Sequence, residues 1–350
     1  MSKIFVWGTG KIASVLLKNL DAERIEGFIE TRKTKEIYYE KRVYSPEEIP
    51  SDFDAIIVAT IHTEAIYECA SRQGLDISKI IFLRRCHGEK ATENLDWKKD
   101  ILGENVYEMY LGEYGLYEQS FFERDRKKYT ELNQRPGFVI KDENIWPIIR
   151  DKFMEAGSVH NYFLQDLWAA RLVYQNLPQE HYDIGSRLDG FIAHVLSFGV
   201  PVKMIDIRPF PEEIDGLETM VGNATDLKEF EDESMESLSA LCSLEHFGLG
   251  RYGDPVDPEA CFKCFENIQR KLKKGGNFYL ALPVGRERVE FNAHRIFYAS
   301  TIIECFHNLQ LMEFSCAADK KIERDVEIHK YDQDTHDGEY RYGLFHFRKM

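Results

Sequence analysis

Polar residues that could hold a nucleoside lie in the second half of the chain, at the ends of apolar segments typical of β-strands. Gly185 lies in a turn that would let backbone N–H groups approach a ligand closely. Asp206 ends the next apolar segment, where a carboxylate can accept hydrogen bonds from both ribose hydroxyls. Asn223 lies at the end of the third, where an amide can bind adenine. The candidate binding residues are Asp183, Gly185, Ser186, Asp206, Asn223, Ala224 and Ser243.

Two histidines could take a proton from a reacting hydroxyl. His246, just beyond the fourth apolar segment, is the first candidate for a general base. A second interpretation stays open, in which the Glu-His pair at this place only fixes the loop. His294 is the second candidate base, and Arg295 beside it could clamp an anionic group. A glycine-rich loop adds residues that could shape a substrate pocket: Arg251, Tyr252 and Asp254.

The segments around these residues alternate between strand and helix patterns, as in an α/β domain with a parallel sheet. Apolar periodicity predicts helices over 163–177, 192–198, 261–272 and 299–309. It predicts strands over 201–206, 237–247, 277–282 and 342–348. Residues 273–276 are typical of a helix C-cap, Pro283 of a strand end, and residues 330–340 of a solvated loop.

This half of the chain resembles a class I S-adenosylmethionine-dependent methyltransferase. It is similar to the group called domain of unknown function 268, through residues 183–191, 243–255, 282–285 and 291–295. The resemblance covers about half the chain, and the long middle motif makes it specific. It implies a seven-stranded sheet and S-adenosylmethionine as the cofactor, and it leaves the substrate open.

The loop of residues 183–191 departs from the common methyltransferase pattern Asp-x-Gly-x-Gly-x-Gly. Arg187 and Asp189 stand where the second and third glycines are expected, and Gly190 comes one place late. We expect Arg187 and Asp189 to form a local ion pair that shapes the loop. A degenerate fold that no longer binds the cofactor is the alternative.

The first residues of the chain form a second, smaller nucleotide-fold pattern. A strand over 3–7 leads through Gly8 and Gly10 into a helix, and a strand over 25–29 ends at Glu30. The order β-α-β-β-α-β resembles the small N-terminal domain of bacterial sugar acyltransferases. That resemblance implies a nucleotide-sugar bound by Gly8, Gly10 and Glu30. The alternative is a glycine turn that merely lets helix and strand pack closely.

The predicted fold class is α/β, with two Rossmann-like units joined by a helical connector. The expected domains are a small parallel-sheet unit (1–88), an aromatic-rich helical connector (89–160) and a methyltransferase-like domain (161–350). The turn signal at 133–137 could mark a hinge between domains.

Composition excludes several classes of partner. The 60 acidic and 45 basic residues give a net charge of −15, which disfavours nucleic acid and anionic membranes. Seven scattered cysteines suit a reducing compartment, and Cys261 with Cys264 lacks the second pair that a zinc site needs, so we expect no metal. No signal-peptide pattern and no apolar run of about 20 residues is present, so we expect a soluble, cytoplasmic protein. The sequence leaves the oligomeric state open, a homo-oligomer included.

The sequence therefore favours a cytoplasmic methyltransferase that acts on a small molecule. The hypothesis is O-methylation of a sugar or nucleotide-sugar in surface-glycan (polysaccharide) biosynthesis, since a phosphorylated or nucleotide-linked acceptor would account for Arg251 and Arg295. One alternative is a non-catalytic nucleotide-sugar-binding or scaffold protein with a degenerate methyltransferase fold. Another is a nicotinamide-dependent oxidoreductase that uses the loop from Gly8 to Ala13, although the first unit is short for a dinucleotide.

Overall fold

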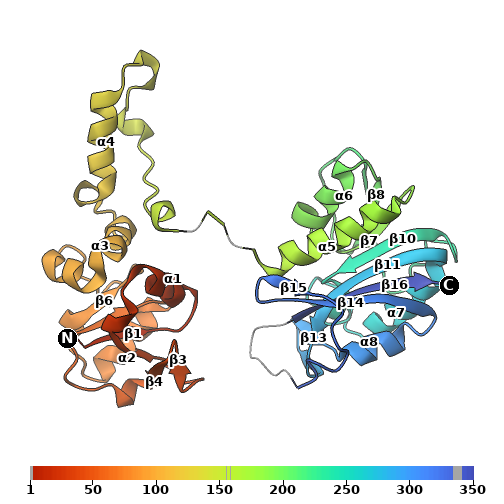
Figure 1. Ribbon diagram of the computed structural model, residues 1–350, viewed down its shortest axis with the longest axis horizontal. Coiled ribbons are helices and arrows are strands. Elements are labelled where there is room, and N and C mark those ends of the chain that lie inside the picture. Colours follow the sequence, from red (N-terminus) through yellow and green to blue (C-terminus); the bar gives the residue numbers. More distant parts are fainter. Residues whose placement is uncertain (1–2, 155, 158, 334–340) are drawn as a thin grey trace. The chain divides into compact units, whose positions relative to one another are not determined.

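The computed structural model describes residues 3–154, 156–157, 159–333 and 341–350. The chain divides into two compact units, Met1–Ser158 and Val159–Met350 (Figure 1). The division lies well after the turn at 133–137, so the hinge expected there is not where the two units separate. Part of the loop expected over 330–340 lies outside the described residues.

The first unit is built on a six-stranded sheet with the order β3-β4-β2-β1-β5-β6. All neighbouring strands are parallel except β3 and β4. These two short strands were not predicted, because their polar residues carry little apolar pattern. The elements are β1 (Ile4–Trp7), α1 (Lys11–Asn19), β2 (Ile25–Ile29), β3 (Ile37–Tyr38), β4 (Lys41–Tyr44), β5 (Ala55–Val58), α2 (Thr63–Arg72), β6 (Ile80–Phe82), α3 (Leu95–Glu113) and α4 (Phe121–Leu132).

The predicted connector contributes to the core of this first unit. Helix α3 buries Leu102, Val106 and Leu111 against a cluster that includes Val6 and Ile57 of the sheet. An apolar helix face packed on a sheet removes its side chains from water, which stabilises both elements. The first part of the connector, through the end of α3, therefore belongs to the fold of the first unit.

The second unit contains an eight-stranded sheet with the order β15-β14-β16-β11-β10-β7-β8-β9. The predicted methyltransferase-type sheet is confirmed, with one strand more than the seven expected, because β15 turns back on β14 as an antiparallel hairpin. The strands are β7 (His181–Ile184), β8 (Val202–Asp206), β9 (Leu217–Val221), β10 (Met235–Leu241), β11 (Leu272–Val284), β14 (Leu309–Ala318), β15 (Lys321–Glu323) and β16 (Arg341–Lys349), and β12 (Arg288–Glu290) pairs separately with β13 (His294–Ile296).

The two ends of β11 differ from the prediction. Residues 273–276 are part of β11 rather than a helix cap, since Leu272 already pairs with Met235 of β10. Pro283 does not end the strand, because β11 continues to Val284 in its pairing with β16. The Ala281 backbone oxygen accepts a hydrogen bond from the N–H of Cys242, just after β10, so Ala281 and Pro283, two residues later, both face the β10 side of the strand. Because β10 has ended before it reaches Pro283, the missing N–H of proline costs no hydrogen bond between the strands.

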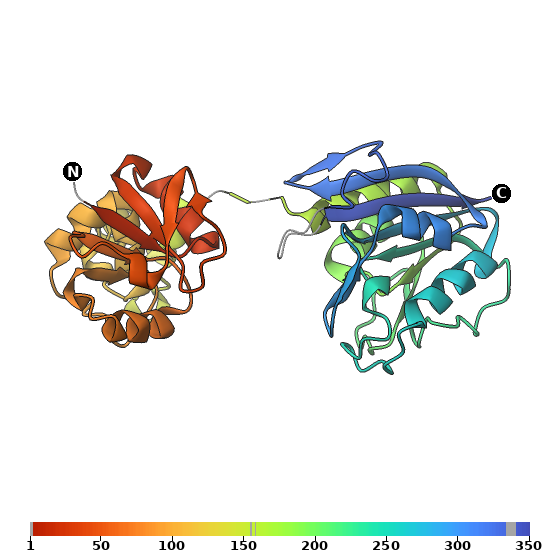
Figure 2. The same cartoon turned by 90° about the horizontal axis from the view of Figure 1, so that it is seen from below.

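Helices cover both faces of this sheet. Helices α5 (Asn161–Asn176) and α6 (Ala193–Ser197) pack on one face, and α7 (Ala260–Lys271) and α8 (Ala299–Cys305) on the other (Figures 1 and 2). Trp168 and Phe191 anchor the first face, and Phe265 and Phe306 the second. The strands between them are buried on both sides, as parallel strands usually are, and β7 and β10 carry four buried polar residues among the apolar ones, His181, Asp183, Ser237 and Ser239.

Strand β7 is the point at which the strand order reverses. The chain continues from β7 to β8 on one side, and the later strand β10 pairs with β7 on its other side. The connections that lead to β8 and to β10 therefore run to opposite sides of β7. In open α/β sheets, such a reversal leaves a crevice beyond the carboxyl ends of the strands, and ligands bind there. Within the part of the chain that the structure describes, no helix is both long and apolar enough to cross a membrane.

Candidate functional site

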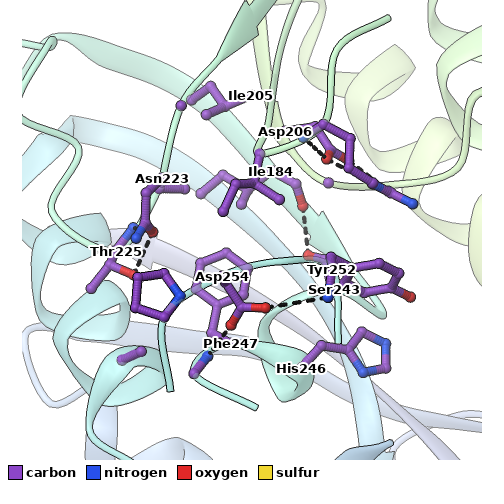
Figure 3. A pocket seen from close by; sticks show the side chains of 18 of the residues that line it. Ile184, Ile205, Asp206, Asn223, Thr225, Ser243, His246, Phe247, Tyr252 and Asp254 are labelled. Carbon is purple, nitrogen blue, oxygen red and sulfur yellow. Dashed lines mark hydrogen bonds and ion pairs between the residues drawn. The ribbon is translucent and has the colours of Figure 1, made fainter. Parts of the chain in front are cut away.

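A cavity lies beyond the carboxyl ends of β7, β8, β9 and β10 (Figure 3). It is where the reversal of strand order predicts a binding site. Most of the residues singled out from the sequence line it: Gly185, Asp206, Asn223, Ala224, Ser243, His246, Tyr252 and Asp254. Apolar side chains complete its wall, among them Ile184, Ile205 and Phe247. We call this the first cavity.

Asp183 and Ser186 do not line the first cavity but hold its floor in place. The Ser186 backbone N–H donates to Asp183 Oδ1 (2.9 Å), and the Ser186 hydroxyl donates to Oδ2 (2.6 Å). The Ser239 hydroxyl of β10 also donates to Oδ2, and Leu241 N–H donates to Ser186 Oγ (3.1 Å). Burial raises the pKa of Asp183 to about 6, against the lowering effect of these hydrogen bonds. The carboxylate thus joins the turn after β7 to β10.

Gly185 is the residue of this turn that faces the cavity. Its φ of +67° is in the left-handed region that other residues avoid. A Cβ atom at this position would lie 3.1 Å from Ser243 Cβ and 4.0 Å from Asp206 Oδ2. Glycine therefore both permits the turn and keeps space between the ends of β7, β8 and β10.

Asp206 is engaged by Arg208, a residue that was not predicted. Arg208 Nε donates to Asp206 Oδ1 (2.9 Å) and Nη2 donates to Oδ2 (2.8 Å), while its guanidinium carbon lies 4.4 Å from the centre of the Tyr252 ring. Burial alone would raise the pKa of Asp206, but the hydrogen bonds and charge of Arg208 outweigh it and hold the pKa below its usual value. A ligand that binds this carboxylate must share it with Arg208 or displace the guanidinium.

Asn223 sits in a local turn at the end of β9. Its side-chain oxygen accepts hydrogen bonds from the Thr225 backbone N–H (3.0 Å) and the Thr225 hydroxyl (2.6 Å). The oxygen is therefore used within the loop, and the amide NH₂ group is what Asn223 can offer to a ligand.

A second cavity adjoins the first. Its lining includes Tyr162, Glu245, Arg251, Phe291, His294 and Tyr342. Cys242 and His246 line both cavities, so the two spaces meet at these residues. A molecule in one cavity would therefore face a molecule in the other across Cys242 and His246.

His246 is held at this junction with one ring nitrogen fixed. Nδ1 lies 2.6 Å from the Ala293 carbonyl oxygen, which can only accept, and 3.3 Å from Arg251 Nη1, which donates to the same carbonyl oxygen (3.1 Å). The shorter contact to the carbonyl assigns the proton to Nδ1 and leaves the free lone pair on Nε2. Burial lowers the pKa of His246 to about 4, although the bond to Ala293 acts in the opposite direction. The ring is neutral at physiological pH, and Nε2 lies 3.5 Å from Glu245 Oε1.

The second predicted base and the predicted substrate residues divide between the two cavities. Arg251 and His294 line the second, and the His294 ring centre is 6.2 Å from that of His246. Burial lowers the pKa of His294 in spite of Glu290, whose Oε2 is 3.2 Å from its Nε2. Asp254 lines the first cavity and holds its loop by accepting from Gly248 N–H (2.7 Å).

Arg295, predicted as an anion clamp, lines neither cavity. Its guanidinium is buried and donates to the backbone oxygens of Phe247 (2.6 Å) and Pro258 (3.2 Å). These bonds hold the loop after β10 in place. They use the guanidinium within the protein, so it does not face a substrate in either cavity. The predicted role as an anion clamp therefore does not fit its position.

The predicted ion pair in the turn after β7 is confirmed. Arg187 Nη2 donates to Asp189 Oδ2 (2.7 Å) and Nε donates to Oδ1 (3.1 Å), with both side chains largely exposed. Neither residue lines the first cavity. The cation that replaces a glycine is therefore turned outward and neutralised, which removes an obstacle to a positively charged ligand.

Several residues that line the cavities were not predicted as site residues, among them Arg208, Cys242, Tyr162 and Tyr342, and Glu245 was considered only as part of a Glu-His pair that fixes the loop. Arg208 follows Asp206 by two positions, and Cys242 and Glu245 directly precede the predicted Ser243 and His246. For Arg208, Cys242 and Glu245, proximity in sequence to a predicted residue was the available signal. It could not show which way their side chains point.

In the first unit, two of the three predicted nucleotide residues, Gly8 and Glu30, are occupied by contacts within the chain. A Cβ atom on Gly8 would lie 2.8 Å from the Ala59 carbonyl oxygen, so this glycine allows β1 and β5 to pack closely. Glu30 accepts from the Thr9 hydroxyl and from Thr34 N–H (2.7 Å). Gly10 precedes α1 with open space around it. Close packing explains Gly8, and nucleotide binding by this loop stays a prediction.

The cysteine pair of α7 is buried in the core of the second unit. Cys261 and Cys264 have no third metal-binding neighbour, and among the described residues no group of three or more His, Cys, Asp or Glu could hold a metal ion. Burial raises the pKa of Cys261 to about 11, which keeps it a thiol.

Comparison with known families agrees with the predicted resemblance in the second unit. Residues 196–349 match the family described as Caenorhabditis protein of unknown function, DUF268. Residues 1–81 match the family described as C2185-like, N-terminal, a description that does not mention acyltransferases. No curated protein matches the chain.

Several solved structures are similar to about half of the chain. A Burkholderia thailandensis 1,6-didemethyltoxoflavin-N1-methyltransferase with S-adenosylhomocysteine is 15% identical over 54% of this chain and 79% of its own, with a TM-score of 0.38. The [4+2]-cyclase SpnF is 13% identical over 53% and 81%, with a TM-score of 0.39. A SAM-dependent methyltransferase from Methanosarcina mazei is 16% identical over 51% and 97%, with a TM-score of 0.35. Matches at this level do not specify a reaction.

Removal of the Asp183 carboxylate should destabilise the second unit. In Asp183→Ala the donors of Ser186 and Ser239 lose their buried acceptor, and we expect the free energy of unfolding to fall by about 1–3 kcal/mol. Urea unfolding followed by circular dichroism measures the change. The matched control Asp189→Ala removes an exposed acid of the same turn and should cost less than about 0.5 kcal/mol. Equal stabilities of the two variants would contradict the role given to Asp183.

Proposed function

We propose that the second unit binds S-adenosylmethionine in the first cavity and transfers its methyl group to an acceptor in the second. One observation carries this proposal: the two cavities meet at Cys242 and His246. Methyl transfer needs an acceptor atom directly in line with the donor, and adjoining sites supply such an approach. The DUF268 match supports the resemblance on which the cofactor prediction rests.

The residues of the first cavity fit the nucleoside part of this cofactor. Gly185 leaves the space that a Cβ atom would fill, and Asp206 offers a carboxylate for the ribose hydroxyls. Asn223 and the Ala224 backbone are placed to bind the base. The outward ion pair of Arg187 keeps its charge away from the cavity. When bound, the cofactor supplies a methyl group on a positively charged sulfur.

His246 is the general base in this proposal. Its Nδ1 proton is committed to Ala293, so Nε2 is the nitrogen that can take a proton from an acceptor hydroxyl. His294 lies near enough to contact the same acceptor. A neutral imidazole at this place also avoids repulsion of a cationic cofactor.

The acceptor that we propose is a sugar or a nucleotide-linked sugar. Tyr162, Tyr342 and Phe291 give the second cavity aromatic rings on which a sugar can pack, and Arg251 offers a cation for a phosphate. A role in surface-glycan biosynthesis in the cytoplasm, with nucleotide-sugar binding by the first unit, extends this proposal. It rests on the predicted resemblance of the first unit to sugar acyltransferases.

A non-catalytic binding or scaffold protein is the second candidate. The observation that favours it is the Arg208 pair with Asp206, which already satisfies the carboxylate that a ribose would use. In this alternative Arg208 fills the nucleoside site permanently. Ligand binding separates the two candidates.

Calorimetric titration should show that the protein binds S-adenosylmethionine and S-adenosylhomocysteine. Asp206→Ala should weaken both about 10- to 100-fold, since a hydrogen bond to a charged group contributes about 1.5–3 kcal/mol. Arg208→Ala should leave binding intact or strengthen it, because it frees the carboxylate of Asp206. His246→Ala is the control that keeps binding. An absence of heat with either ligand, in the wild type and in Arg208→Ala, would contradict the proposal.

A glycine pair separates an effect on the cavity from an effect on the backbone. Gly185 and Gly199 both have positive φ, +67° and +84°, but a Cβ atom meets Ser243 only at Gly185 and nothing within 4 Å at Gly199. Both Gly185→Ala and Gly199→Ala should lower stability by about 1–2 kcal/mol. Only Gly185→Ala should also weaken the binding of S-adenosylhomocysteine, measured by calorimetry. Equal affinities in the two variants would place the ligand elsewhere.

A further inference from the structure

Glu245 is a buried acid at the junction that the proposed transfer does not yet use. It follows β10 in a short 3₁₀ helix, Leu244–His246, is 2% exposed, and lines the second cavity. Its Oε2 atom is buried and has no hydrogen-bond partner among the described residues. Its Oε1 atom lies 3.5 Å from His246 Nε2, which is too long for a good hydrogen bond. A buried oxygen in this state favours the neutral carboxylic acid.

Among the described residues, Arg251 is the one cation that acts on the Glu245 carboxyl group, and the buried guanidinium of Arg295 lies instead against the Glu245 backbone oxygen (3.4 Å). Arg251 acts to lower the pKa of Glu245, while burial acts more strongly and raises the pKa to about 8. The other facing groups are neutral near pH 7: Cys242, Tyr162 and Tyr342 have raised pKa values, and His246 has a lowered one. Glu245 is thus the group at the junction poised to change charge near neutral pH.

We propose that Glu245 is the terminal proton acceptor of the transfer, and that positive charge entering the junction converts it from carboxylic acid to carboxylate. This inference rests on the proposed function. It joins Glu245 to the reaction through His246, which lines the acceptor cavity and whose Nε2 lies 3.5 Å from Glu245 Oε1.

The proton balance of the step is complete with these two residues. The acceptor oxygen forms a bond to the methyl carbon, the carbon–sulfur bond breaks, and its electron pair stays on sulfur. The hydroxyl proton passes to His246 Nε2, and from Nε2 to the Glu245 carboxylate. A protonated His246 would be costly in this buried place, so a stronger base beside it completes the transfer. Glu245 is then again the neutral carboxylic acid, and it returns this proton to solvent when the next sulfonium binds.

The charge of the cofactor explains how the acid becomes a base when it is needed. An opposite charge nearby favours the ionised form of a carboxyl group, so a sulfonium at the junction lowers the pKa of Glu245. S-adenosylhomocysteine has a neutral sulfur and lacks this effect. Binding of the sulfonium form should therefore release a proton from Glu245, and binding of the neutral form should not.

Calorimetry of the full chain at pH 7.5, in phosphate and in Tris, measures proton release as the dependence of the apparent enthalpy on the buffer. We expect S-adenosylmethionine to release roughly half a proton or more, and S-adenosylhomocysteine to release none beyond that of its shared amino acid part. Glu245→Gln should bind both ligands and lose this difference. Asp166→Asn is the matched control, because Asp166 is a buried acid whose pKa of about 6 leaves it already ionised at this pH, and it should keep the difference.

The wild type gives a second measurement that needs no variant. The ratio of affinities for S-adenosylmethionine over S-adenosylhomocysteine should rise with pH and level off above about pH 8, since ionised Glu245 favours only the sulfonium. Equal proton release by the two ligands, a ratio that does not change with pH, or unchanged release in Glu245→Gln would overturn the inference and leave the proposed function standing. A wild type that binds neither ligand would instead overturn the proposed function.

Discussion

The buried carboxylate of Asp183 is the interaction on which both cavities depend. It accepts hydrogen bonds from the turn after β7 and from β10. β10 is the strand that pairs with β7 where the strand order reverses. That constraint places Gly185 and Ser243 next to each other in the wall of the first cavity. His246 and Glu245 come soon after Ser243 in the chain, so the second cavity takes its position from the same contact.

Electrostatics distinguishes the two cavities. In the first, the charge of Asp206 is matched by Arg208, and in the turn after β7 Arg187 is matched by Asp189. At the junction the balance is different, because Glu245 is buried without a strong donor and His246 is held neutral. A cationic ligand entering there would meet little opposing positive charge except that of Arg251. The arrangement suits a cofactor whose positive charge disappears in the reaction.

Strand ends were predictable from sequence, and side-chain partners were not. Asp206 and Asn223 were placed correctly because a carboxylate or amide after an apolar strand must lie at the sheet's carboxyl edge. β14 was missed because the helix pattern of 299–309 ran into it without a break. Arg208 and Arg295 show the limit most clearly: each guanidinium has several acceptors within reach, and only the folded backbone selects Asp206 for one and backbone carbonyls for the other. The same limit hid Glu245, whose burial depends on the loop that Arg295 fastens.

The proposed function requires a nucleoside cofactor to bind at the carboxyl ends of β7, β8 and β9. Hydrogen exchange followed by mass spectrometry, with and without S-adenosylhomocysteine, tests this binding on the whole chain. We expect slower exchange in the segments that line the first cavity, around 184–186, 205–208, 222–225 and 242–257, and no change in the glycine turn of the first unit. Protection confined to residues 8–13, or no protection anywhere at saturating ligand, would contradict it.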